Sequence, residues 1–94
     1  MTIARSSQSG SAARIDLSRT FIRRTDLSGA SLVGANLSYA DCTNANFSGA
    51  DFKDAILEGT ILKGADLSGA RNLTSAQIRQ AIIDERTVLP KGLR

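Results

Sequence analysis

The stretch that decides the fold runs from residue 15 to residue 69 and reads, in blocks of five, IDLSR TFIRR TDLSG ASLVG ANLSY ADCTN ANFSG ADFKD AILEG TILKG ADLSG. The eleven blocks follow one another without a gap, and the third position is apolar in every block. The first position is Ala in seven blocks, the second is Asp or Asn in seven, and the fifth is Gly in six. A strict short period indicates a repeat architecture in which every block builds the same unit.

A period of five suits neither an α-helix nor a straight strand. On a helix, at about 3.6 residues per turn, each step of five rotates the apolar residue by about 140°, so no apolar stripe forms. On a straight strand, an odd period sends successive apolar residues to opposite faces. The third positions can all point inward only if the backbone bends once per block, and four bends of about 90° close a square coil of twenty residues. The predicted core is therefore the set of third-position residues: Leu17, Ile22, Leu27, Leu32, Leu37, Cys42, Phe47, Phe52, Leu57, Leu62 and Leu67.

The remaining positions of each block fit the same coil. The first position shares the inward direction of the third, and it is usually Ala because the interior there is narrow. Asp, Asn, Ser and Gly at the other positions supply turn chemistry. Every fourth block falls on the same side, so eleven blocks make slightly less than three coils.

The blocks ANLSY, ANFSG, ADFKD and ADLSG resemble the A(D/N)LXX consensus of the pentapeptide-repeat family. The resemblance covers residues 15–69, and it implies an all-β solenoid, namely a right-handed quadrilateral β-helix with β-turns at its corners. Residues 73–93, LTSAQIRQAIIDERTVLPKGL, also resemble the segment that often closes proteins of this family.

Residues 70–94 are predicted to be a helical cap and tail. Thr74 and Gln77 are spaced as a capping box, and Leu73 and Ile78 as a hydrophobic staple, which predicts a helix from about residue 75 to residue 83. Ile82 belongs to the apolar stripe of that helix. We interpret this segment as a lid on the last coil; a second interpretation is a dimerisation element, and the two are compatible.

No comparable lid is visible before the repeat. Residues 1–14 are rich in Ser and Ala and are predicted to be a mobile N-terminal segment. We expect either that this segment folds over the first coil or that the coil end meets another molecule.

Three apolar residues, Phe21, Ile56 and Ile61, break the pattern because they occupy the outward second position. One interpretation is that the tail folds back over Ile56 and Ile61. The other is a contact patch on the side shared by Phe21 and Ile61, with Asp41 between them. The residues of this predicted interaction surface are Phe21, Arg23, Arg24, Ile61 and Lys63.

No residue pattern in the sequence indicates catalysis. The chain has no His and a single Cys, so an internal disulfide is excluded, and Cys42 falls at a core position. The acidic residues of the repeat mostly occupy the turn-forming position, and no metal-ligand cluster, nucleophile motif or phosphate loop is present. We predict that the protein is not an enzyme and binds no cofactor, metal or small-molecule substrate. Since neither a secretion signal nor a run of transmembrane length is present, we expect a cytoplasmic protein without a membrane partner.

The predicted function is a non-catalytic structural or protein-interaction module, whose partner the sequence does not identify, with a homodimer through the coil end or the cap as a further expectation. The resemblance implies an alternative, because some members of the family look like duplex DNA and bind DNA gyrase. Residues 15–69 carry seven acidic and five basic residues, a net charge of −2. A duplex of about 14 Å would carry about eight charges, so the charge disfavours DNA mimicry. Binding of nucleic acid through the basic residues is a weaker alternative.

Overall fold

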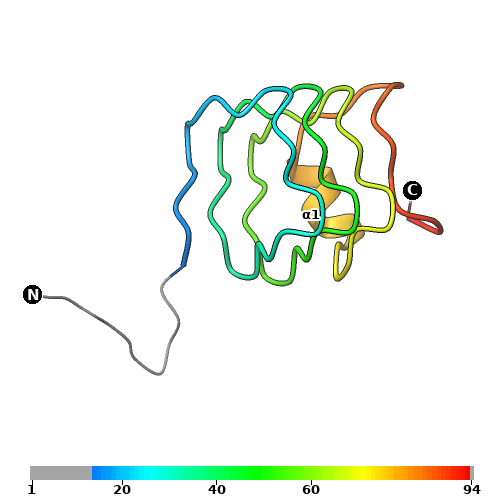
Figure 1. Ribbon diagram of the computed structural model, residues 1–94, viewed down its shortest axis with the longest axis horizontal. Coiled ribbons are helices and arrows are strands. Elements are labelled where there is room, and N and C mark those ends of the chain that lie inside the picture. Colours follow the sequence, from blue (N-terminus) through cyan, green and yellow to red (C-terminus); the bar gives the residue numbers. More distant parts are fainter. Residues whose placement is uncertain (1–13, 94) are drawn as a thin grey trace, which may run out of the picture.

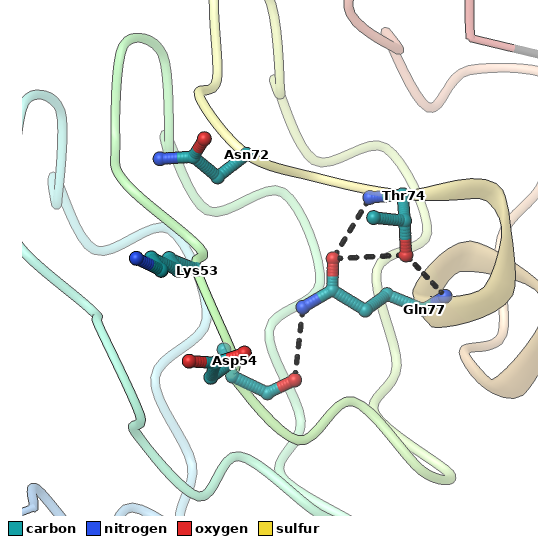
Figure 2. A pocket seen from close by; sticks show the side chains of 6 residues that line it. Lys53, Asp54, Asn72, Thr74 and Gln77 are labelled. Atoms are coloured by element: carbon teal, nitrogen blue, oxygen red, sulfur yellow. Dashed lines mark hydrogen bonds between the residues drawn. The ribbon is translucent and has the colours of Figure 1, made fainter.

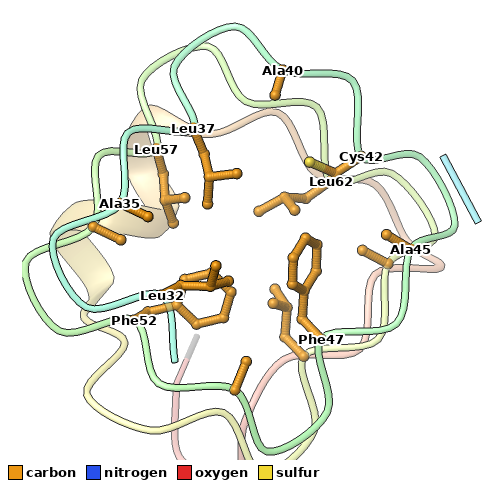
Figure 3. Close-up of a cluster of buried hydrophobic side chains, with 14 of the residues drawn as sticks. Leu32, Ala35, Leu37, Ala40, Cys42, Ala45, Phe47, Phe52, Leu57 and Leu62 are labelled. Atoms are coloured by element: carbon orange, nitrogen blue, oxygen red, sulfur yellow. The ribbon is translucent and has the colours of Figure 1, made fainter. Parts of the chain in front are cut away.

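Parallel β-bridges link residues one coil apart along the repeat. The structure, a computed structural model, describes residues 14–93. Eight bridges join residues twenty apart, from Asp16 with Asn36 to Asp51 with Arg71. Backbone hydrogen bonds support them; the N–H of Leu37, for example, donates to the carbonyl of Ile56 at 2.9 Å. Successive turns of the chain therefore stack side by side into a solenoid (Figure 1) with a square outline in cross-section (Figure 3).

The bridged second-position residues define four sides, and each side is named here after its first bridged residue. The rows are Asp16, Asn36 and Ile56 on the Asp16 side; Phe21, Asp41, Ile61 and Ile82 on the Phe21 side; Asp26, Asn46, Asp66 and Val88 on the Asp26 side; and Ser31, Asp51 and Arg71 on the Ser31 side.

The interior is filled by the residues at the third and first positions of the blocks. From Leu32 to Leu67, every third-position side chain is at most 2% exposed. Phe47 and Phe52 meet edge to face, with ring centroids 5.5 Å apart and an interplanar angle of 61° (Figure 3). The first-coil residues Leu17, Ile22 and Leu27 are only partly buried and pack against this core from one end, because only one neighbouring coil lies beside them in the described chain.

Each corner is a four-residue turn whose third residue, the fifth position of the block, has positive φ. All fifth positions adopt φ between 57° and 71°, including the non-glycine residues Arg19, Arg24, Tyr39, Asn44 and Asp54. Positive φ confined to the third residue of a four-residue turn is the signature of a type II β-turn. The Gly preference at this position follows, because glycine adopts that conformation without steric cost.

The Asp and Asn residues at the second position hold these turns through their side-chain oxygens. Asp16 Oδ1 accepts the N–H of Ser18 at 3.0 Å and its hydroxyl at 2.6 Å. Asn36 Oδ1 accepts the same two groups of Ser38 at 3.0 and 2.7 Å. An amide and a carboxylate therefore serve equally as acceptors.

This equivalence predicts a change in acid sensitivity. The hydroxyl and N–H donors two residues on lower the pKa of each second-position carboxyl at Asp16, Asp26, Asp41 and Asp66. A lowered folded-state pKa stabilises the fold above the unfolded value of about 3.9 and loses this contribution as pH falls through the folded-state pKa. Changing all four residues to Asn should leave stability at pH 7 nearly unchanged and reduce its decline below about pH 4. Urea unfolding followed by circular dichroism at both pH values measures this; an equal decline in the variant would contradict it.

The helix α1 (Ser75–Gln80) ends three residues earlier than predicted. Ala81 is extended, with φ −91° and ψ 167°, and Ile82 forms a parallel bridge with Ile61. The prediction that the helix reaches residue 83 and carries Ile82 on its apolar stripe was therefore wrong, because backbone pairing with the preceding coil replaces the last helical turn.

The tail continues the winding of the solenoid. Bridges from Ile61 to Ile82 and from Asp66 to Val88 span 21 and 22 residues, so the chain returns to the same two sides after short insertions. The interpretation that the tail covers Ile56 and Ile61 was wrong for Ile56, because this side chain remains 46% exposed. Ile61 is partly buried, and the tail residue Ile82 pairs with it.

The predicted mobile segment at residues 1–14 lies outside the described residues except for Arg14, whose guanidinium donates to the carbonyl of Gly34 at 3.5 Å. Over residues 14–93, no helix is long and apolar enough to cross a lipid bilayer.

Candidate functional site

An apolar row stands outward along the Phe21 side. Phe21 is 84% exposed and Ile82 is 44% exposed, while Ile61 between them is partly buried. All three share one bridged row, in which Asp41 occupies the second level. Sequence reasoning placed Phe21 and Ile61 together because they are forty residues apart, but it missed Ile82 because one inserted residue shifts the period.

Basic side chains flank this row on its turn positions. Arg23 Nε lies 3.8 Å from Asp41 Oδ2, with the Arg23 side chain 58% exposed. Arg86 Nε lies 3.8 Å from Asp84 Oδ2. The remaining two cations of the flank, Arg24 and Lys63, form no ion pair among the described residues.

Two of the three carboxylates of this surface, those of Asp41 and Asp84, are engaged in the fold. The Thr43 hydroxyl donates to Asp41 at 2.6 Å and lowers the pKa of that carboxyl, so Asp41 stays ionised. Asp84 Oδ1 accepts the backbone N–H of Gly64 at 3.0 Å. Four cations against three carboxylates, the third being the exposed Glu85 beside Arg86, leave this surface with a net charge of +1.

A second exposed aromatic residue lies at the corner next to the Phe21 side. Tyr39 is 48% exposed, and its hydroxyl donates to Glu58 Oε2 at 3.0 Å. The Arg19 guanidinium lies 4.9 Å from the centre of the Tyr39 ring, a cation–π contact. The signal for this cluster was present in the sequence, since residues 19, 39 and 58 belong to the same corner in successive coils.

A hollow of about 590 Å³ lies between α1 and the neighbouring coil, lined by Lys53, Asp54, Ala55, Asn72, Thr74 and Gln77 (Figure 2). The side-chain amide of Gln77 is fully occupied: Oε1 accepts the Thr74 N–H at 2.8 Å, and Nε2 donates to the carbonyls of Phe52 and Ala55, both at 2.9 Å. Asn72 Nδ2 donates to Asp51 Oδ1 at 2.8 Å. The side-chain amides of Gln77 and Asn72 thus hold the fold together, and the residues that line the hollow present no nucleophile paired with a base.

The predicted capping residues surround α1. The Thr74 side chain accepts the N–H of Gln77 at 3.2 Å, which completes the capping box. Ile78 is buried as a member of the core, and Leu73 is partly buried against that core. Ile82 instead belongs to the exposed row of the Phe21 side.

Cys42 is the titratable side chain most removed from water. It is 0% exposed, and burial, with a smaller contribution from Asp41, raises the pKa of its thiol to about 12. Over residues 14–93, no group of three or more His, Cys, Asp or Glu side chains is placed to hold a metal ion.

The thiol of Cys42 should therefore resist alkylation in the folded protein. Because the thiolate is the reactive form, we expect iodoacetamide at pH 8 to react at least about a thousandfold more slowly in buffer than in denaturing urea. Mass spectrometry of timed samples measures both rates. Rapid labelling of protein that retains its native circular dichroism would contradict the burial of Cys42.

Comparisons with known proteins agree with the repeat. The family model described as pentapeptide repeats, with eight copies of the repeat, matches residues 13–49 and 40–84 of this chain. The solved structure of Rfr23, a pentapeptide repeat protein of the cyanobacterium Cyanothece 51142, is similar at 30% identity and a TM-score of 0.71. That similarity covers 82% of this chain and 52% of Rfr23, so the chain spans about half the length of Rfr23.

Two further solved structures are similar in sequence. A pentapeptide repeat protein of Nostoc PCC 7120 is 28% identical over 86% of this chain and 78% of its own, with a TM-score of 0.37. One from the thylakoid lumen of Arabidopsis thaliana is 23% identical over 81% of this chain and 55% of its own, with a TM-score of 0.31. None of the curated proteins matches the sequence. With the repeat model matched across most of its length, the chain belongs to the pentapeptide-repeat family.

Proposed function

We propose that this protein is a non-catalytic interaction module that presents its Phe21 side to a protein partner. In this proposal the module is a right-handed quadrilateral β-helix of just under three pentapeptide coils. The segment that contains α1 closes it at the C-terminal end. We also propose a cytoplasmic location.

The observation that carries the proposal is the apolar row of Phe21, Ile61 and Ile82, whose two outer members are exposed. Beside it lie Arg24 and Lys63, two cations that form no ion pair within residues 14–93. The corresponding rows of the other sides consist of Asp, Asn, Ser and Arg residues, apart from single apolar residues at Ile56 and Val88. Phe21 is 84% exposed, so its side chain contributes almost nothing to folding. Exposed apolar residues that gather in one place, with a charged rim, are typical of a binding surface.

Affinity capture from the native cell, with identification by mass spectrometry, tests this proposal when variants are compared. The test variant is Phe21→Ser, and the matched control is Val33→Ser, which changes an apolar residue 46% exposed on another side. We expect a protein that binds the wild type and the control stoichiometrically but is lost with Phe21→Ser. A partner retained equally by all three forms would contradict the choice of side, and no stoichiometric partner would contradict the function.

Self-association through the coil end or the segment around α1 is a separate part of the proposal. Light scattering across a concentration series measures it. A mass that stays monomeric at the highest concentration would contradict self-association and would leave the role of the Phe21 side unaffected.

A further inference from the structure

We propose that the Phe21 side binds an acidic amphipathic helix that lies along the solenoid axis, with one of its residues opposite each coil. This inference rests on the proposed function and adds the chemistry of the partner. The helix contributes apolar residues opposite Phe21, Ile61 and Ile82, and acidic residues toward the basic flank.

The spacing of the coils matches the rise of an α-helix. The bridged row Phe21, Asp41, Ile61 and Ile82 presents one outward side chain per coil. With neighbouring strands about 4.8 Å apart, these lie at about 0, 4.8, 9.6 and 14.4 Å along the axis. Positions i, i+3, i+7 and i+10 of a helix lie on one face at about 0, 4.5, 10.5 and 15 Å. Each of the four helix positions therefore meets one coil.

An extended peptide fits this row less well. Residues on one face of a strand recur about every 6.7 Å, so they would lie at about 0, 6.7 and 13.4 Å. The second of these falls between Asp41 and Ile61, and no residue would face Ile61 directly. The spacing thus favours a helix.

The charges determine the composition of the partner helix. Arg24 and Lys63 form no ion pair in the described chain, and the contacts of Arg23 and Arg86 with their carboxylates are long, at 3.8 Å. Glu residues beside the apolar positions of the helix would complement this flank. Asp41 faces position i+3, where a Lys would pair with this carboxylate and an apolar residue would remove water from it without offering a charge in exchange.

A second copy of this chain does not fit the surface. In the described chain α1 has six residues, no acidic residue in its first turn, and Arg79 in its last. Pairing of two Phe21 sides would also bring two surfaces of net positive charge together. Nucleic acid fits no better, because its phosphates would meet Asp41, and they offer nothing to the apolar row.

The probe is a fluorescently labelled peptide of about 18 residues with an Ala-rich helical frame. It carries Leu at i, i+7 and i+10, Lys at i+3, and Glu at the flanking positions. We expect it to bind the full chain with a Kd on the order of 10–100 μM by fluorescence anisotropy, weakening as salt is raised. Phe21→Ser and the double change Arg24→Glu with Lys63→Glu should each weaken binding about tenfold. Val33→Ser should leave binding unchanged.

Two matched peptides test the charge and the register. In the first, Lys replaces each flanking Glu; in the second, the Lys at i+3 and the Leu at i+10 exchange places, which preserves composition. Both should bind at least about tenfold more weakly than the probe. No binding of the probe, or equal binding of all three peptides, would overturn the inference.

Two further outcomes separate this inference from the proposed function. If a captured native partner depends on Phe21 while the probe does not bind, the proposed function stands and the acidic helix is wrong. If light scattering shows a dimer that Phe21→Ser abolishes, the occupant is a second copy and the inference is overturned.

Discussion

Replacing Phe47 with Ala is expected to lower the free energy of unfolding by about 3–5 kcal/mol. The Phe47 side chain is 0% exposed and meets the ring of Phe52 edge to face at 5.5 Å. Its removal loses both the burial of the ring and this aromatic contact, and it leaves a cavity that a stack of hydrogen-bonded coils has little freedom to close. Since small domains are stable by only about 5–15 kcal/mol, this one change removes a large part of the total.

Phe21→Ala is the matched control for Phe47→Ala, because it removes the same ring from a site that is 84% exposed. We expect its effect to stay within about 0.5 kcal/mol. Urea unfolding followed by circular dichroism measures both variants, and Phe47→Leu serves if Phe47→Ala does not fold. Equal destabilisation by the two Ala variants would mean that the inward and outward positions of the repeat have been misassigned.

Gln77→Glu is expected to destabilise the protein by about 2 kcal/mol. Residue 77 is the third position of α1, where general capping rules make Glu at least as favourable as Gln. In this fold, however, Gln77 Nε2 donates to the carbonyls of Phe52 and Ala55 at 2.9 Å each. A carboxylate loses both bonds and places negative charge against two carbonyl oxygens. The substitution is therefore destabilising here, although the capping rules alone would make it neutral or favourable.

Gln80→Glu in the same helix is the control, because this side chain is exposed and forms no side-chain hydrogen bond in the described chain. The introduced carboxyl at residue 77 should have a raised folded-state pKa, so its protonated form is the one the fold tolerates. The loss of stability of Gln77→Glu relative to Gln80→Glu should therefore be small near pH 4 and grow as pH rises toward 7. Thermal unfolding at both pH values measures it. A variant at residue 77 as stable as the control at pH 7 would show that the contacts to the preceding coil are not made.

The repeat made most of the fold predictable because each coil contains the same five-residue pattern four times. A five-residue period with an apolar third position requires one bend per block, and the bridges twenty residues apart follow from four bends. The row of Phe21 and Ile61 could be placed from the same arithmetic. The structure adds that the rows continue beyond the repeat, through Ile82 and Val88.

What could not be predicted depends on pairing between the tail and the last repeat coil. Helix propensity favours continuation of α1 through Ile82, but the N–H of Ile82 donates to the carbonyl of Thr60 at 2.8 Å and turns the residue outward. The double contact of Gln77 likewise joins residues 22 and 25 positions apart. Neither contact can be predicted from the residues that are close to it in the sequence.

The stacking of coils determines which residues share the Phe21 side, and NMR couplings across hydrogen bonds measure it most directly. The structure predicts couplings from the Cys42 N–H to the Ile61 carbonyl, at 2.8 Å, and from the Leu62 N–H to the Ile82 carbonyl, at 2.7 Å. Observation of both would establish that Asp41, Ile61 and Ile82 form one row, and a coupling from the Ile22 N–H to the Asp41 carbonyl, at 2.9 Å, would add Phe21 to it. Couplings from these amides to any other carbonyl would place the residues on different sides and contradict the account.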